Sequence, residues 1–431
     1  MSTTLVLLIL GISYVGFVFC MYKGYNAMLC FAVTSIIWAV VTGGGLKGTL
    51  NLLSQGTMTG ANTMLLIVLG SWFGHLMLET GIIKGIINKA IEFSGGKPYV
   101  ICTLLCMVTA FIFITGYGSG VVIAVGVIVL PIMFSLGVPK ALAASVFALS
   151  IGSGLFLNPT IYNLTTVSIQ KLISEESRFV WQRFAFAPMI ISTVITVICF
   201  NISLRRTPEF KTSAWAATVA GGDGNTKPDA PIYSFIIPLV PIVIFIITKF
   251  NMIPIYYFTF FLTLLITKNM GKGKHPLQIL IKSLKDGVSD VAVLYGYILF
   301  LNIFIEAAGV IRGTVSGPIS QILPQSPIVF AIACVILAPL ALYRGPLAPA
   351  GAGAALMGPI VTLGVFPESF LLGMILLLSV AISFGFCPTV GWNAWITSYT
   401  EVKMSQYLKR CLIQQWPLMA VLAVVVCVVF L

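Results

Sequence analysis

The sequence predicts an all-α protein that crosses a lipid bilayer many times. Of its 431 residues, 58% are hydrophobic and only 8% are charged, which is more apolar surface than a soluble core can bury. Apolar runs of roughly 20 residues, the length needed to cross the hydrocarbon layer, recur from Leu5 to Leu431. Two further apolar stretches are interrupted by glycine-rich sequence at their middle. Together these observations predict a polytopic membrane protein with broken helices.

Charge and cysteine usage exclude several other classes. The net charge is +12, but the basic residues fall in short loops between apolar runs, where they orient the chain in the membrane. We therefore predict no nucleic-acid partner. The nine cysteines lie in or beside apolar runs without the paired loop spacing of a disulfide framework or a zinc site. We predict packing thiols, no metal site and no bound cofactor.

Ten crossing segments are predicted from the apolar runs. They begin near residues 4, 26, 57, 140, 184, 232, 252, 288, 368 and 412. The stretches 98–137 and 327–364 are long enough for two passes each, but residues 117–120 read Tyr-Gly-Ser-Gly and residues 343–346 read Tyr-Arg-Gly-Pro. We interpret each stretch as a hairpin that enters and leaves on one side, the first from the cytoplasm and the second from outside.

The distribution of lysine and arginine predicts the orientation. With the N-terminus outside and neither hairpin changing side, the inner loops hold 17 of the 24 basic residues, the outer loops hold 6, and Arg344 lies in the second hairpin. Such a bias is what the positive-inside rule expects. The sequence therefore predicts a multi-pass protein of a bacterial inner membrane with both termini outside.

An internal repeat is the most informative pattern. Residues 81–85 resemble residues 309–313 at an offset of 228, and Asn-Pro-Thr at 158–160 matches Cys-Pro-Thr at 387–389 at an offset of 229. Five crossing segments in each half place the halves in opposite orientation. The predicted units are a first inverted repeat at 1–204, a cytoplasmic linker at 205–231, and a second inverted repeat at 232–431.

Inverted repeats with interrupted helices at matching positions indicate a secondary transporter whose site lies near the bilayer midplane. Unpaired backbone groups at such breaks persist only where protein, water or ligand satisfies them. Helix N-termini and the guanidinium of Arg344 favour an anion there. The predicted substrate-binding residues are Gly118, Ser119, Gly120, Asn158, Thr160, Asn163, Arg344, Gly345, Thr389 and Asn393.

Candidates for binding a coupling ion, either a proton or a transported sodium ion, offer neutral oxygens or an ionisable group. They are Ser119, Asn158, Asn393, His75 and Glu79. Each assignment has a structural alternative. His75, Glu79, Asp290 and Glu306 could be interfacial residues at helix ends, Arg344 could extend to the membrane surface, and Asn163 and Asn393 could make structural hydrogen bonds.

The sequence resembles the ion transporter superfamily of organic-anion carriers, and within it the gluconate-permease (GntP) type, with citrate, lactate and C4-dicarboxylate permeases as neighbours. The resemblance is carried by residues 69–74 leading to 79–81, by the hairpin residues 117–137, and by the breaks at 158–160 and 387–389. It implies a homodimer with separate scaffold and transport parts and an elevator-like movement.

We therefore predict a symporter or exchanger of a small organic anion, such as a mono- or dicarboxylate, that is not an enzyme. A cation/proton antiporter of the same superfamily is the first alternative, and a channel is the second. An intramembrane serine protease at Ser119 or Ser153 would need a base beside the serine. The chain contains only two histidines, His75 and His275.

Overall fold

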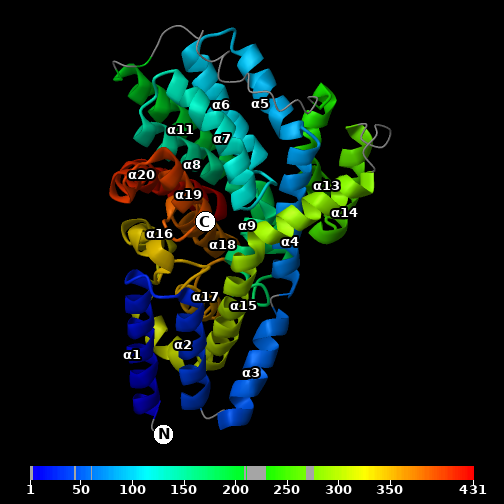
Figure 1. The fold of residues 1–431 in the computed structure, drawn as a ribbon. Helices are drawn as coiled ribbons and strands as arrows, with labels where there is room; N and C mark the ends of the chain where they lie inside the picture. The colour runs from blue at the N-terminus through cyan, green and yellow to red at the C-terminus, as the bar shows by residue number, and fades with distance from the viewer. Residues whose placement is uncertain (1–2, 43–44, 60, 208–209, 211–229, 268–275) are drawn as a thin grey trace.

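The computed structural model is built from helices and turns throughout the part of the chain that it describes, without a strand (Figure 1). It describes all residues except 1–2, 43–44, 60, 208–209, 211–229 and 268–275. The predicted linker at 205–231 therefore lies largely outside the described residues. The fold is that of an all-α polytopic membrane protein, as the sequence predicts.

The first half of the chain forms eleven described helices. They are α1 (Thr3–Tyr22), α2 (Ala27–Val41), α3 (Gly45–Thr59), α4 (Ala61–Glu79), α5 (Ile82–Phe93), α6 (Pro98–Ile112), α7 (Ser119–Ser135), α8 (Lys140–Leu155), α9 (Pro159–Thr166), α10 (Glu175–Phe184) and α11 (Phe186–Arg205).

The second half is divided into shorter pieces around one long helix. Its described elements are η1 (Ile232–Leu239), α13 (Val240–Thr248), α14 (Met252–Ile266), α15 (Pro276–Ile322), α16 (Pro327–Ile336), η2 (Ala338–Arg344), α17 (Ala354–Thr362), α18 (Glu368–Leu377), η3 (Leu378–Phe384), α19 (Gly391–Thr400) and α20 (Met404–Phe430).

Each of the ten predicted crossing segments coincides with a helix or a pair of helices. Among the described residues, five helices are long and apolar enough to cross a membrane, or up to seven if each of two bent pairs is one span. Shorter apolar helices, such as α2 and α14, account for other predicted segments. The outer faces of α1 and α11 expose apolar side chains along their length, as lipid contact requires.

Both glycine-rich stretches are interrupted where the sequence predicts. Helices α6 and α7 have 15 and 17 residues, so at 1.5 Å per residue they are about 23 and 26 Å long, short of the roughly 30 Å hydrocarbon layer. The second stretch is more fragmented, because α16 bends by 57° into η2 and Tyr343 and Arg344 have positive φ. Short helices joined by a turn agree with a hairpin.

Two other helices break at the predicted motifs. Helix α8 ends just before Asn158, and α9 leaves at 78° to it. Proline at position 159 starts α9 because its missing N–H would have no partner in the first helical turn. The second break separates η3 from α19 and contains Cys387 and Pro388.

Helix α15 corrects one prediction. The sequence places Arg312 in an outer loop, yet α15 continues as one helix of 47 residues through Ile322, about 70 Å at 1.5 Å per residue. It packs along α2, α3, α4 and α17 (Figure 1). The apolar pattern of the sequence ends where contact with lipid ends. The helix itself continues, because other parts of the protein pack against it, and Arg312 lies beside Gly358 there.

Candidate functional site

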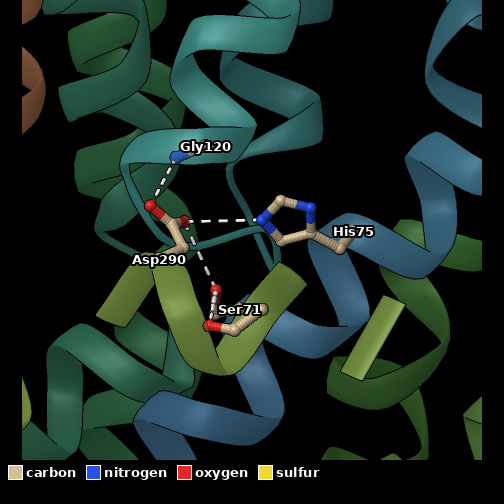
Figure 2. A network of polar contacts seen from close by, with 5 residues as sticks. Ser71, His75, Gly120 and Asp290 are labelled. Atoms are coloured by element: carbon tan, nitrogen blue, oxygen red, sulfur yellow. Dashed lines mark hydrogen bonds and ion pairs between the residues drawn. The ribbon is translucent and has the colours of Figure 1, made fainter. Parts of the chain in front are cut away.

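The tip of the first hairpin rests on a carboxylate from α15. The backbone N–H of Gly120, in the first turn of α7, donates a 2.7 Å hydrogen bond to Asp290 Oδ1. Ser71 Oγ, on α4, lies 3.4 Å from Asp290 Oδ2 and 3.0 Å from the Gly287 carbonyl oxygen. Figure 2 shows these groups converging on Asp290 from three helices. The carboxylate thus joins α4, α7 and α15.

His75 adds an ionisable group to the same cluster. Its Nε2 atom lies 3.6 Å from Asp290 Oδ2, and the two side chains are 15% and 9% exposed (Figure 2). This nitrogen is buried and has no hydrogen-bond partner. The distance is too long for a hydrogen bond but short enough for an ion pair when the imidazole carries a proton.

The hairpin tip needs glycine because its backbone passes very close to Asp290 and His75. Gly118 has φ +106°, a conformation that side chains disfavour, and a Cβ there would lie 2.2 Å from Asp290 Oδ2. A Cβ on Gly120 would lie 2.8 Å from His75 Nε2. The Gly-Ser-Gly sequence therefore lets the backbone reach the carboxylate. Its helix N-terminus faces the negative charge of Asp290, and the substrate anion expected at this break stays a prediction.

Asp290 was missed as a site residue by sequence reasoning, which favoured an interfacial position near a helix end. The structure places it 14 residues after the start of α15, against the hairpin. An ionisable residue inside an apolar run was the available signal, because such residues are costly in lipid and mark functional positions. Glu79, by contrast, pairs with Lys282 at 2.8 Å near the ends of α4 and α15.

Ser119 and Tyr117 connect the first tip to the second half of the chain. A Cβ on Gly391, the first residue of α19, would lie 3.2 Å from Ser119 Oγ. The Tyr117 ring meets the Trp392 ring edge-on, with centroids 5.7 Å apart. The indole N–H of Trp392 is buried without a hydrogen-bond partner. The first hairpin and the second break thus meet around an unused donor.

Both the donor and the acceptor group of the Asn158 side chain are used in hydrogen bonds within the fold. Its side chain is buried, and its Nδ2 donates 3.0 Å hydrogen bonds to the carbonyl oxygens of Phe113 and Gly116, just before the hairpin tip. Its Oδ1 accepts from the N–H groups of Thr160 and Ile161. The residue caps α9 and ties it to the first hairpin.

Thr160 and Asn163 lie on α9. Thr160 Oγ1 donates to the Leu66 carbonyl oxygen at 3.2 Å. Asn163 Nδ2 donates to the Pro159 carbonyl oxygen at 2.8 Å, and Gln170 donates to the Asn163 side-chain oxygen. Asn163 also lines a cavity of about 660 Å³ between α4, α9, α10, α13 and α14. Of these two predicted site residues, Asn163 therefore faces open space.

The second break is held by a weaker set of contacts. Asn393 is buried; its Nδ2 donates to the Cys387 carbonyl oxygen at 3.1 Å, and its Oδ1 accepts from Tyr407 at 2.8 Å. Cys387 Sγ accepts from the backbone N–H of Tyr343 in the second hairpin at 3.1 Å and lies 3.1 Å from Thr389 Oγ1. The second break, like the first, contacts the hairpin of its own half.

Arg344 brings a cation to the second tip. Its guanidinium carbon lies 4.1 Å from the centroid of the Tyr297 ring, and its Nη1 donates to the Ala350 carbonyl oxygen at 3.2 Å. The Tyr297 hydroxyl donates to the same oxygen at 2.5 Å. Gly345 is confined, because a Cβ there would lie 2.2 Å from the Leu340 carbonyl oxygen. The guanidinium is thus turned toward α15.

Helix α15 therefore serves both tips. Asp290 contacts the first and Tyr297 the second, seven residues or about 10 Å further along the same helix face. The arrangement brings a carboxylate to the first tip and a guanidinium to the second, and the buried indole N–H of Trp392 lies beside the first tip at Tyr117.

This fold defines the class of the protein, which is that of all-α polytopic membrane proteins. No family model matches the chain. The YdaH transporter of Alcanivorax borkumensis shares the fold with a TM-score of 0.63 at 11% identity, over 93% of this chain and 98% of that one. The MtrF efflux pump of Neisseria gonorrhoeae gives a TM-score of 0.61 at 12% identity, over 88% and 84%.

A sequence relative is a Mg²⁺/citrate complex secondary transporter of Bacillus subtilis, 21% identical over 132 residues. The match spans 31% of this chain and 30% of that protein. The chain is thus similar in fold to two transporters and, over less than a third of its length, in sequence to a third. The gluconate-permease type remains a prediction.

Proposed function

We propose that the protein is a secondary active transporter of a small organic anion, such as a mono- or dicarboxylate, driven by a proton or sodium gradient. The sequence relative is named as a transporter of a citrate complex, which supports this substrate class. Alternating access would operate around the cluster between the two hairpin tips. A homodimer with elevator-like movement belongs to the same proposal.

Arg344 is the observation that carries the proposal. It is a permanent cation on a strained backbone, with φ +61°, held at the tip of a helix break by one carbonyl oxygen and one ring. A guanidinium binds carboxylate through two parallel hydrogen bonds and can exchange a carbonyl partner for a charged one. The free indole N–H of Trp392 supplies a further donor.

The test is uptake of radiolabelled citrate, malate, lactate and gluconate into vesicles containing the purified protein. We expect at least one to accumulate, and Arg344→Ala to lower its uptake about 100-fold, since truncating one member of a buried charge pair costs about 2–5 kcal/mol. Arg410→Ala, an exposed site on α20, is the matched control. Unchanged uptake by a folded Arg344→Ala protein would remove this residue from the site.

A cation/proton antiporter is the second candidate, and Asp290 is the observation that favours it. The sequence argues against a cation site because the breaks themselves contain no acidic residue, but the fold brings a carboxylate to one of them. An antiporter would move protons in response to sodium alone. Vesicles without any organic solute should then show a sodium-driven pH change.

A further inference from the structure

We propose that Asp290, with His75 beside it, is the proton-binding site through which a proton gradient drives this carrier, and that proton binding releases the first hairpin tip from α4 and α15. The proposal rests on the proposed function for its transport consequences. The site itself, the carboxylate between Gly120, Ser71 and His75, is defined by geometry alone.

The deprotonated carboxylate is the form that the structure stabilises. A nearly buried negative charge persists only if it is paired or hydrogen-bonded. Here Gly120 N–H donates to one carboxylate oxygen, the positive end of α7 faces it, and Ser71 Oγ, which also donates to the Gly287 carbonyl oxygen, lies 3.4 Å from the other. These contacts attract a negative oxygen, and His75 at ion-pair distance does so when its imidazole carries a proton.

Protonation of Asp290 weakens each of them. Hydrogen bonds to an ionised acceptor are roughly twice as strong as neutral ones, and the helix end attracts only the charged form. The Gly120 contact is a direct bond between α15 and the hairpin, so its weakening frees the tip. When the proton leaves, the carboxylate binds the tip again. The charge on Asp290 thus couples to the hairpin position.

His75 provides the second titrating group of the cluster. Imidazole changes charge near neutral pH more readily than other side chains. Because its Nε2 faces Asp290 without a hydrogen bond, it can accept a proton there or pass one to the carboxylate.

The surrounding charges do not replace this pair. Glu79 of α4 and Lys282 of α15 bind each other, more than two turns from Asp290 along α15. Lys285 and Asp286 lie about one turn before Asp290 on the same helix. From the hairpins, the nearest titratable and charged groups named above are the Tyr117 phenol and the Arg344 guanidinium.

The chemistry favours a proton over a metal cation. A hard cation needs several oxygen ligands and no competing donors, whereas here a backbone N–H and an imidazole nitrogen occupy two sides of the carboxylate. The site therefore selects a proton.

The first experiment measures hydrogen–deuterium exchange of the peptide that contains Gly118, Ser119 and Gly120, corrected for intrinsic rates, from about pH 8 to about pH 3, a range in which aspartate side chains become protonated. We expect protection in the unaltered protein to fall as the pH falls. Asp290→Asn should exchange about tenfold faster at pH 8 and lose the pH dependence, since a neutral amide cannot supply the charge.

Asp286→Asn, on the same helix, is the matched control and should exchange like the unaltered protein. If Asp290→Asn does not fold, the pH series of the unaltered protein still tests the proposal. His75→Gln tests it as well, and should reduce the pH dependence of exchange at the tip. Protection that is constant with pH in the unaltered protein, or normal in folded Asp290→Asn, overturns the proposal.

The second experiment measures uptake in vesicles. Asp290→Asn should lose at least about tenfold of uptake driven by a pH gradient, while carboxylate binding, followed by thermal shift, remains. Uptake driven by sodium and unaffected by Asp290→Asn would overturn the assignment of the proton site. If no carboxylate is bound or transported, the proposed function fails, and the exchange experiment still judges the proton site.

Discussion

The two hairpin tips differ in the source and sign of their charge. The first has no charged side chain of its own, and its helix N-terminus at Gly120 binds the Asp290 carboxylate of α15. The second carries its own cation, Arg344, and α15 contributes the Tyr297 ring beneath it, while the Ala350 carbonyl oxygen of the hairpin accepts from both side chains. In the proposals above, the first tip, whose helix N-terminus is already paired with Asp290, takes part in proton binding. The second tip, where Arg344 has only a carbonyl oxygen and a ring as partners, binds the substrate anion.

The breaks that support the tips differ in the same direction. Asn158 makes two donor bonds to the first hairpin and accepts two from α9. At the matching position, Cys387 accepts one bond from the second hairpin through sulfur, a weak acceptor. Asn158 therefore holds the first hairpin more firmly than Cys387 holds the second, and the predictions below test the breaks first and then the tips.

Asn158→Ala should have the largest effect. It leaves two carbonyl oxygens and two N–H groups buried and unpaired, at about 1–3 kcal/mol each, so we expect a loss of about 4 kcal/mol or more of unfolding free energy. Cys387→Ala should cost about 1 kcal/mol. Thermal unfolding in detergent compares them. Equal losses would show that the two hairpins are held alike.

Gly118→Ala comes next. Its Cβ would combine a conformation restricted to glycine with a 2.2 Å approach to Asp290 Oδ2, and we expect a cost of about 3 kcal/mol together with faster exchange at the tip. Gly364→Ala is the control, because φ is +63° there and the space is open, so only strain of about 1 kcal/mol applies. Similar behaviour of both variants would contradict the close approach.

Tyr297→Phe should have the smallest effect. It removes the hydroxyl that donates to the Ala350 carbonyl oxygen but keeps the ring beneath Arg344. A loss of about 1 kcal/mol in positioning raises the apparent KM for the carboxylate about fivefold. Tyr297→Leu also removes the cation–π contact and should raise KM further. Uptake against substrate concentration measures both, and no difference between them would exclude a role for the ring.

Local sequence determined the elements and their interruptions. The apolar runs predicted the helices, and the Asn-Pro-Thr and Cys-Pro-Thr motifs predicted the breaks at Asn158 and Cys387, because proline and glycine act within a few residues of themselves. Arg344 could be singled out because a cation inside an apolar hairpin is rare. The inverted relation of the halves stays a prediction from sequence.

Only the tertiary structure decided which partner each break meets. Gly120 and Asp290 are 170 residues apart, and hydrophobic pattern shows that a helix is buried without showing which helix covers it. The same limit concealed the continuity of α15, whose central position follows from packing along four other helices. Sequence alone thus predicted a helix N-terminus that favours a negative charge. Only the fold showed that the Asp290 carboxylate lies there, because contacts between distant helices depend on packing rather than on local chemistry.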